Sequence, residues 1–68
     1  MAGVDKVSVY MDGRLYYLSP GTVDFEDVIR VTKARNVRAV EVVYGNLRAT
    51  LTLGKNIVLQ NDMRFTTR

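Results

Sequence analysis

Cysteine and histidine are both absent from the sequence. Without cysteine, neither a disulfide framework nor a thiolate metal site can hold the chain together. Without histidine, zinc and haem lack their usual ligand, and acid–base catalysis lacks the side chain that titrates near neutral pH. We therefore expect no metal, no cofactor and no small-molecule substrate.

Long hydrophobic runs are absent too. No apolar stretch approaches the roughly 20 residues of a transmembrane helix, and residues 1–6 lack the apolar segment of a signal peptide. The sequence also contains no internal repeat, linker or low-complexity stretch. We therefore expect a cytoplasmic protein, without a membrane segment, that forms a single domain over residues 1–68. A domain this small buries only about 60% of the surface that its unfolded chain exposes, so its stability margin is thin.

The charge balance is modestly positive. Ten lysine and arginine residues against seven aspartate and glutamate residues give a net charge of +3. From Arg30 to Arg48 five residues are basic, whereas Glu41 alone is acidic. This balance is compatible with nucleic acid or an acidic protein as a partner. It is also compatible with a solvated surface that keeps a small protein soluble.

Apolar and polar side chains alternate over much of residues 40–65. In residues 47–53 the leucines and the alanine fall on one face, and the arginine and the threonines fall on the other. A period of two is typical of a strand with one buried and one exposed face. Gly45-Asn46 predicts a two-residue hairpin turn, and turns at 54–56 and 61–62 predict further short strands. The sequence thus predicts a C-terminal meander of three or four strands.

The first half of the chain predicts a hairpin followed by a helix. Apolar alternation flanks Asp12-Gly13, the strongest short hairpin signal, and Pro20-Gly21 then ends the pattern. Residues 25, 28, 29 and 32 recur at the spacing of one helix face. Asp24 is a suitable N-cap, and Asn36 can end the helix in a left-handed conformation.

One helix laid across a sheet is the economical way to cover a single apolar face. The sequence therefore predicts an α+β fold, in which one helix packs on a small, mostly antiparallel sheet made of the N-terminal hairpin and the C-terminal meander. The predicted core consists of the apolar residues on the inward faces: Val7, Val9, Met11, Leu15, Phe25, Val28, Ile29, Val40, Val42, Leu47, Leu51, Leu53, Leu59 and Phe65.

The candidate catalytic groups have structural explanations. Asp24, Glu26 and Asp27 lie together at the expected helix start, where capping and the helix dipole account for them. The serine and threonine residues lack a histidine base, and the lysines stand in no recognisable site. The glycines lie in turns, and their spacing forms no phosphate-binding loop. We therefore predict that the protein is not an enzyme.

Two kinds of surface remain as candidates for binding. Arginines on the outer face of the sheet, with tyrosines near enough to stack on a base, suit single-stranded nucleic acid. This candidate surface, for nucleic acid or another partner, consists of Arg38, Arg48, Arg64, Arg68, Tyr10 and Tyr16. The other candidate is an open sheet edge that accepts a strand from a protein partner or from a second copy in a homo-oligomer. Tyr10, Tyr16 and Val58 are its expected anchors, unless Lys55 and the arginines blunt the edges.

The order of hairpin, helix and further strands is that of the β-grasp fold, whose familiar member is ubiquitin. Three segments resemble bacterial ubiquitin-like modules of the multi-ubiquitin kind: residues 9–16 (VYMDGRLY), 22–29 (TVDFEDVI) and 57–65 (IVLQNDMRF). The resemblance spans most of the chain, from residue 9 to residue 65, and implies a β-grasp fold. Conjugated ubiquitin-like proteins end in a flexible Gly-Gly, whereas this sequence ends Phe65-Thr66-Thr67-Arg68, so the resemblance does not extend to conjugation chemistry.

Two functional expectations follow from these observations. The first is a non-catalytic interaction module that binds protein partners, or self-assembles, through a face or an edge of the sheet. The alternative is a small basic nucleic-acid-binding protein that uses an Arg/Thr sheet face. The alternative requires the four arginines to share one face of the molecule.

Overall fold

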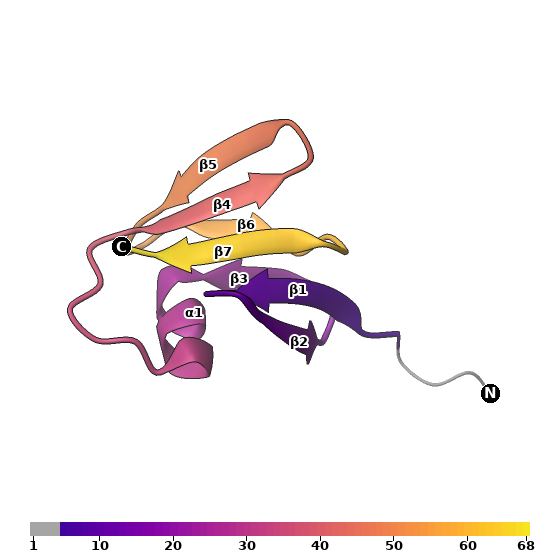
Figure 1. Ribbon diagram of the computed structural model, residues 1–68, viewed down its shortest axis with the longest axis horizontal. Helices are drawn as coiled ribbons and strands as arrows, with labels where there is room; N and C mark the ends of the chain where they lie inside the picture. Colours follow the sequence, from indigo (N-terminus) through magenta and orange to yellow (C-terminus); the bar gives the residue numbers. More distant parts are fainter. Residues whose placement is uncertain (1–4) are drawn as a thin grey trace.

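The computed structural model describes residues 5–68, which form one helix and seven short strands (Figure 1). The elements are β1 (Val7–Met11), β2 (Arg14–Leu18), β3 (Thr22–Asp24), α1 (Phe25–Thr32), β4 (Val40–Tyr44), β5 (Leu47–Leu51), β6 (Asn56–Val58) and β7 (Met63–Thr67). The hairpin turns at Asp12-Gly13 and Gly45-Asn46 are confirmed, and so is the helix that begins after Asp24. The chain thus has an α+β fold.

The strands do not follow one another across the sheet in chain order. Five form a mixed sheet in the order β2-β1-β7-β4-β5, and β3 pairs with β6 in a separate two-stranded sheet. β7 is parallel to β1 and antiparallel to β4. The predicted C-terminal meander is therefore wrong, because β7 leaves β5 and β6 and enters the centre of the sheet. In that position its apolar residues, Met63 and Phe65, are buried.

Side-chain and backbone hydrogen bonds hold β7 against β1 at both ends of the pair. At one end, the Asn61 Oδ1 accepts a hydrogen bond from the Ser8 backbone N–H at 3.0 Å, and the Asp62 N–H donates to the Ser8 carbonyl at 2.7 Å. At the other end, the Asp12 carboxylate accepts from both the backbone N–H and the hydroxyl of Thr67, at 2.8 and 2.7 Å. These bonds fix the register of the parallel pair.

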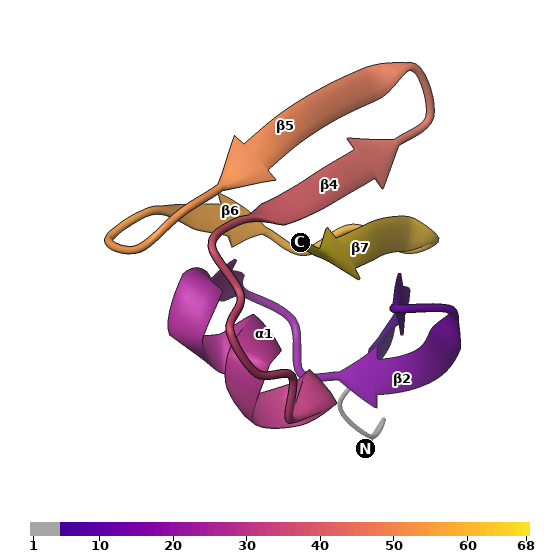
Figure 2. The ribbon, with the colours of Figure 1, turned by 60° about the vertical axis from the view of Figure 1, so that its left-hand side comes forward.

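The hydrophobic core lies between α1 and one face of the five-stranded sheet (Figure 2). Its buried side chains are Val9, Met11, Val23, Val28, Val40, Val42, Leu51, Leu59, Met63 and Phe65. Phe65 is the largest of them and lies opposite Val42 on β4 and Met11 on β1. Val23 and Met63 were not predicted as core residues, because each stands beside a turn or a capping residue in the sequence.

The helix is shorter than predicted. It ends at Lys33, which adopts a left-handed conformation (φ 58°) and donates its backbone N–H to the Ile29 carbonyl at 2.7 Å. Asn36, the predicted stop, is also left-handed but lies beyond the end of the helix. No helix within residues 5–68 is long and apolar enough to cross a membrane.

Three leucines that were predicted in the core are instead exposed: Leu15 at 45%, Leu47 at 69% and Leu53 at 71%. Leu15 pairs with Tyr10, and this register places it on the outer face of β2. Leu53 lies in the turn after β5. Leu47 is on the inner face of β5, but the β4–β5 hairpin extends away from α1 in both views (Figures 1 and 2), so the helix does not cover this end.

Candidate binding surfaces

The outer face of the sheet carries a row of paired side chains that crosses all five strands. Arg64 on β7 lies between Tyr10 on β1 and Val43 on β4, and the row continues to Leu15 on β2 and to Arg48 on β5. The guanidinium carbon of Arg64 is 4.8 Å from the centroid of the Tyr10 ring. This is the geometry of a cation–π contact, which is worth about 0.5–1 kcal/mol at an exposed site.

Glu41 on β4 lies between two of the arginines. Arg68 approaches one carboxylate oxygen at 2.5 Å, and Arg48 approaches the other at 3.9 Å. The hydrogen bond and the charge of Arg68, and more weakly the charge of Arg48, lower the pKa of Glu41. The same pair raises the pKa of Arg68. Glu41 therefore compensates part of the positive charge on this face.

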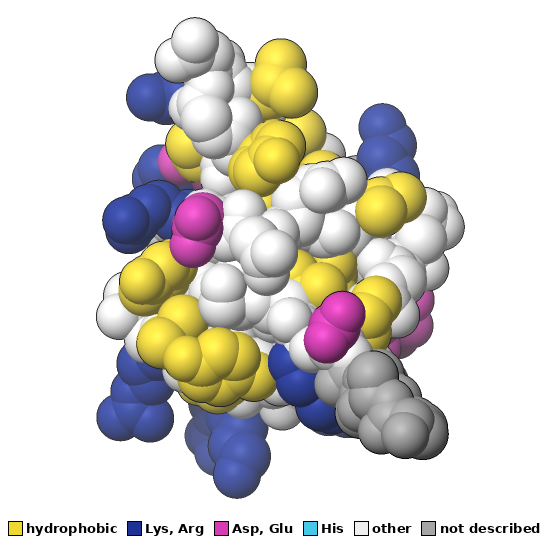
Figure 3. Space-filling model, turned by 90° about the vertical axis from the view of Figure 1, so that its right-hand side faces the viewer, with side chains coloured by type: hydrophobic (Ala, Val, Ile, Leu, Met, Phe, Trp, Pro, Cys, Tyr) yellow, Lys and Arg dark blue, Asp and Glu magenta, His cyan; other side chains and the backbone are white. Residues whose placement is uncertain are grey.

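The predicted Arg/Tyr surface is assembled in part. Arg48, Arg64 and Tyr10 belong to the outer row, and Arg68 joins them through Glu41. Arg38 is exposed, and its backbone N–H donates to the Arg68 carbonyl at 2.7 Å, so the two residues are neighbours through their backbones. Figure 3 shows several basic side chains along the left of the view, and others at its lower centre and upper right.

Tyr16 does not belong to this surface. It pairs with Val9, so its side chain lies on the inner face of β2, half-buried against the core. Its prediction as a stacking residue is therefore wrong. The reason is the register of the hairpin, since Tyr16 and Tyr17 are adjacent in the chain and must point to opposite faces. The exposed one is Tyr17.

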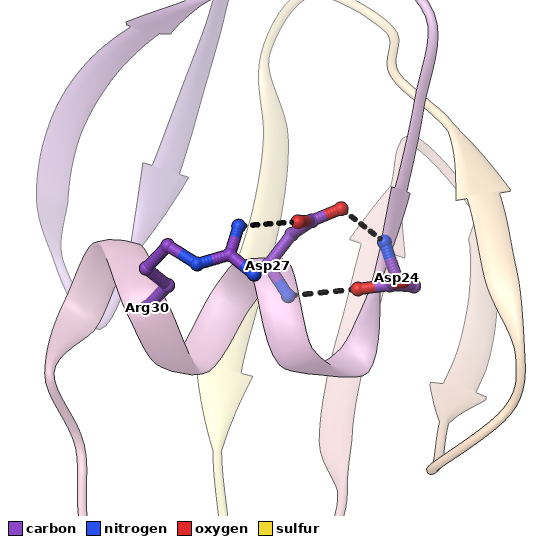
Figure 4. Close-up of polar contacts among 3 residues, drawn as sticks. All are labelled: Asp24, Asp27 and Arg30. Carbon is purple, nitrogen blue, oxygen red and sulfur yellow. Dashed lines mark hydrogen bonds and ion pairs between the residues drawn. The ribbon is translucent and has the colours of Figure 1, made fainter.

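The acidic residues at the helix start form a capping box (Figure 4). The Asp27 N–H donates to Asp24 Oδ1 at 2.8 Å, and the Asp24 N–H donates to Asp27 Oδ2 at 3.1 Å. Arg30 also contacts Asp27, at 2.8 Å. The Asp24 N–H, assisted by Arg30 and partly opposed by burial, lowers the pKa of Asp27. Both carboxylates are thus engaged in holding the helix, as their capping positions predicted.

An open apolar pocket of about 230 Å³ lies on the inner side of the β4–β5 hairpin. Its lining residues are Val42, Tyr44, Leu47, Arg48, Ala49, Ile57 and Met63. Val42 and Met63 are buried and mark the edge of the core, whereas Leu47 and Ala49 on β5 are exposed. Hydrophobic side chains are visible near the projecting turn in Figure 3. The pocket is therefore the place where the apolar face of the sheet extends beyond its cover.

The sequence contained a signal for this pocket. The alternation correctly assigned Leu47 and Ala49 to the inner face, but burial also requires a covering element. A helix of eight residues is about 12 Å long, too short to cover a five-stranded sheet from edge to edge. The length of the apolar face relative to the helix was the indication that part of that face stays open.

The pocket adjoins an open edge of the sheet. β5 is the terminal strand of the five-stranded sheet and pairs with β4 on one side. An edge strand presents unpaired backbone N–H and C=O groups to incoming chains unless proline, lysine or a bulge blocks it. β5 contains neither proline nor lysine, and Arg48 is its one charged residue. Backbone donors, backbone acceptors and apolar side chains therefore lie together on this hairpin.

Comparisons with known proteins provide no relative: no family model, no curated protein and no solved structure matches the chain. Within residues 5–68, no group of three or more acidic side chains is placed to hold a metal ion.

Proposed function

We propose that the protein is a non-catalytic interaction module that binds a protein partner through the β4–β5 hairpin. The observation that carries this proposal is that an apolar pocket and an open strand edge coincide on β5. Interface centres typically combine apolar and aromatic anchors with a polar rim. Leu47 and Tyr44 supply such anchors here, and Arg48 supplies a charged group on the other face of the same strand.

The free energy that a partner would gain by burying this exposed apolar surface supports a role in protein binding. Burial of an exposed leucine side chain stabilises a complex by about 1.5–3 kcal/mol before the costs of association are subtracted. Leu47 is 69% exposed, so most of that contribution is available to a partner. Strand addition at β5 would contribute backbone hydrogen bonds at the same place.

We also infer that the fold is of the β-grasp type. The parallel pair β1 and β7 is flanked by β2 on one side and by the β4–β5 hairpin on the other, and a single helix lies on one face. This order supports the resemblance to bacterial ubiquitin-like modules. A fold of this kind carries many functions, so it supports an interaction module without specifying the partner.

Affinity capture with two matched variants tests the proposal. Leu47→Thr removes an exposed leucine from the pocket, whereas Leu53→Thr removes an equally exposed leucine that is outside the pocket lining. Immobilised wild type and Leu53→Thr should retain the same proteins from a lysate of the source cells, and Leu47→Thr should lose them. Equal retention by all three forms, or by none, would contradict the proposal. Light scattering on the same samples detects self-assembly.

Nucleic-acid binding is the second candidate, and the contact of Arg64 with Tyr10 favours it. If this surface binds single strands, affinity should fall steeply with salt as counterions are released. Labelled single- and double-stranded oligonucleotides, titrated at low and moderate salt, provide the measurement. Arg64→Gln should weaken any such binding, whereas Arg14→Gln, on the edge strand β2, should not. No binding near micromolar concentration at low salt removes this candidate.

A further inference from the structure

An apolar pocket, an open strand edge and the charge of Arg48 lie together on β5. Together they indicate which chemical kind of partner this strand binds. We propose that the occupant is an extended peptide segment of alternating acidic and apolar residues, which adds to β5 as a sixth strand of the sheet. This inference rests on the proposed interaction function and specifies what the β4–β5 hairpin binds.

The alternation follows from the geometry of an added strand. Side chains of a strand point alternately to the two faces of the sheet. On one face, the added residues would meet the pocket beside Leu47 and Ala49, the apolar side chains that β5 contributes to its lining. On the other face, they would lie beside Arg48 and Thr50. Apolar residues at every second position therefore suit the pocket, and polar residues must occupy the positions between them.

The charge on the outer face favours acidic residues at those positions. Arg48 has a side chain that is 76% exposed and is 3.9 Å from Glu41. Glu41 is held more closely by Arg68, at 2.5 Å. Arg48 is therefore only loosely engaged and can turn to an incoming carboxylate. Cross-strand pairs of opposite charge stabilise a sheet, whereas like charges opposite each other destabilise it.

A second copy of the chain fits this edge less well. Stable dimers bury about 1,200–2,000 Å² in total, and the edge of a single five-residue strand offers much less. A net charge of +3 also makes two copies repel. Antiparallel pairing of two β5 strands would bring both Arg48 side chains onto one face. Strand addition by a short peptide needs no such area, because backbone hydrogen bonds supply much of the affinity.

The test uses two capped heptapeptides, one alternating Glu with Val and the other alternating Lys with Val. We expect the Glu/Val peptide to bind about tenfold more tightly at low salt, because attraction to the arginine face replaces repulsion. The difference should shrink in about 1 M salt, where the Debye length falls to about 3 Å. Arg48→Gln should remove most of the difference, whereas Arg14→Gln on β2 should leave it intact. Amide chemical shifts should change along β5 and at Ile57.

Several results would overturn the inference. One is equal affinity for the two peptides, and another is amide shifts confined to β2 or to Tyr10 and Arg64. Concentration-dependent dimerisation that is abolished by Leu47→Thr would assign the edge to a second copy. Displacement of the peptide by an oligonucleotide that binds at the outer row around Arg64 would show that the arginines of this face bind nucleic acid. If Leu47→Thr loses captured partners but neither peptide binds, this inference fails while the interaction module stands.

Discussion

The two hairpins of the sheet have the same strand pattern, but the side chains on their inner faces differ in burial. Each has two five-residue strands joined by a two-residue turn, and each places apolar side chains on the inner face. Tyr16 and Leu18 of the β1–β2 hairpin are half-buried against the core. Leu47 and Ala49 of the β4–β5 hairpin are exposed. The same strand pattern therefore supports the core on one side of the sheet and forms a candidate binding surface on the other.

The two turns also differ, in backbone conformation and in their hydrogen bonds to the rest of the protein. In the first hairpin, Asp12 and Gly13 are both left-handed (φ 51° and 84°), and the Asp12 carboxylate holds Thr67 on β7. In the second, Gly45 is left-handed and Asn46 is not. The side-chain hydrogen bonds found within residues 5–68 include none from Gly45 or Asn46 to the rest of the protein. The first hairpin is thus fastened to the central strand at its turn, and the second is held mainly by its pairing with β7.

The largest effect is expected at β7, the strand to which both hairpins are attached. Phe65→Ala removes the largest fully buried side chain and should lower the free energy of unfolding by about 3–5 kcal/mol. Loss of that amount would unfold much of the population in a domain this small. Urea denaturation followed by circular dichroism measures it, with Phe65→Leu as a milder companion. A cost below about 1 kcal/mol would show that the two hairpins do not share this core.

A smaller effect should separate the two turns. Asp12→Ala removes both hydrogen bonds to Thr67 and strains a left-handed residue, so we expect a cost of about 1–3 kcal/mol. Asn46→Ala should stay within about 0.5 kcal/mol. Asp12→Asn, which retains an acceptor and tolerates the left-handed conformation, should fall between them. Urea midpoints provide the comparison, and equal costs at the two turns would remove the distinction between the hairpins.

Acid should weaken both the helix cap and the outer face. The pKa values of Asp27 and Glu41 are lower in the folded protein than their ordinary values. Their contributions to stability are therefore complete above the ordinary carboxyl pKa of about 4 and are lost as the pH falls through the lower folded values. Asp27→Asn and Glu41→Gln should each flatten the acid limb of the stability profile. Unaltered acid limbs in thermal melts between pH 2 and pH 6 would contradict these two assignments.

The smallest effect is expected on the open hairpin. Leu47→Thr and Leu53→Thr should each change the free energy of unfolding by less than about 0.5 kcal/mol, because both side chains are largely exposed. Urea denaturation checks this expectation and also validates the pair for the capture experiment. A cost above about 1.5 kcal/mol for Leu47→Thr would place this residue in the core, as the alternation had predicted.

The local features of the fold were predictable from the sequence, and the long-range ones were not. Asp12-Gly13, Gly45-Asn46 and the capping residue Asp24 each act within a few neighbours, so their effects could be inferred from the chain alone. The place of β7 depends on contacts of Ser8 with Asn61, more than fifty residues away. No local pattern specifies such a contact.

The candidate site shows the same division. Alternation correctly placed Arg48 and Arg64 on one face, because a period of two is a property of the strand itself. Tyr16 was misplaced, since only the hairpin register decides which of two adjacent tyrosines is exposed. The pocket beside Leu47 was missed because the alternation within β5 assigns Leu47 to the inner face but does not show that α1 is too short to cover it.

Mapping of the contact surface by nuclear magnetic resonance tests the central claim most directly. Addition of a captured partner to the isotope-labelled protein should shift the amide signals of residues 44–51 and of Ile57. The signals of Tyr10, Leu15 and Arg64 should stay unchanged, which would place the contact at the β4–β5 hairpin. Shifts confined to the outer row or to β2, with residues 44–51 unaffected, would contradict the account.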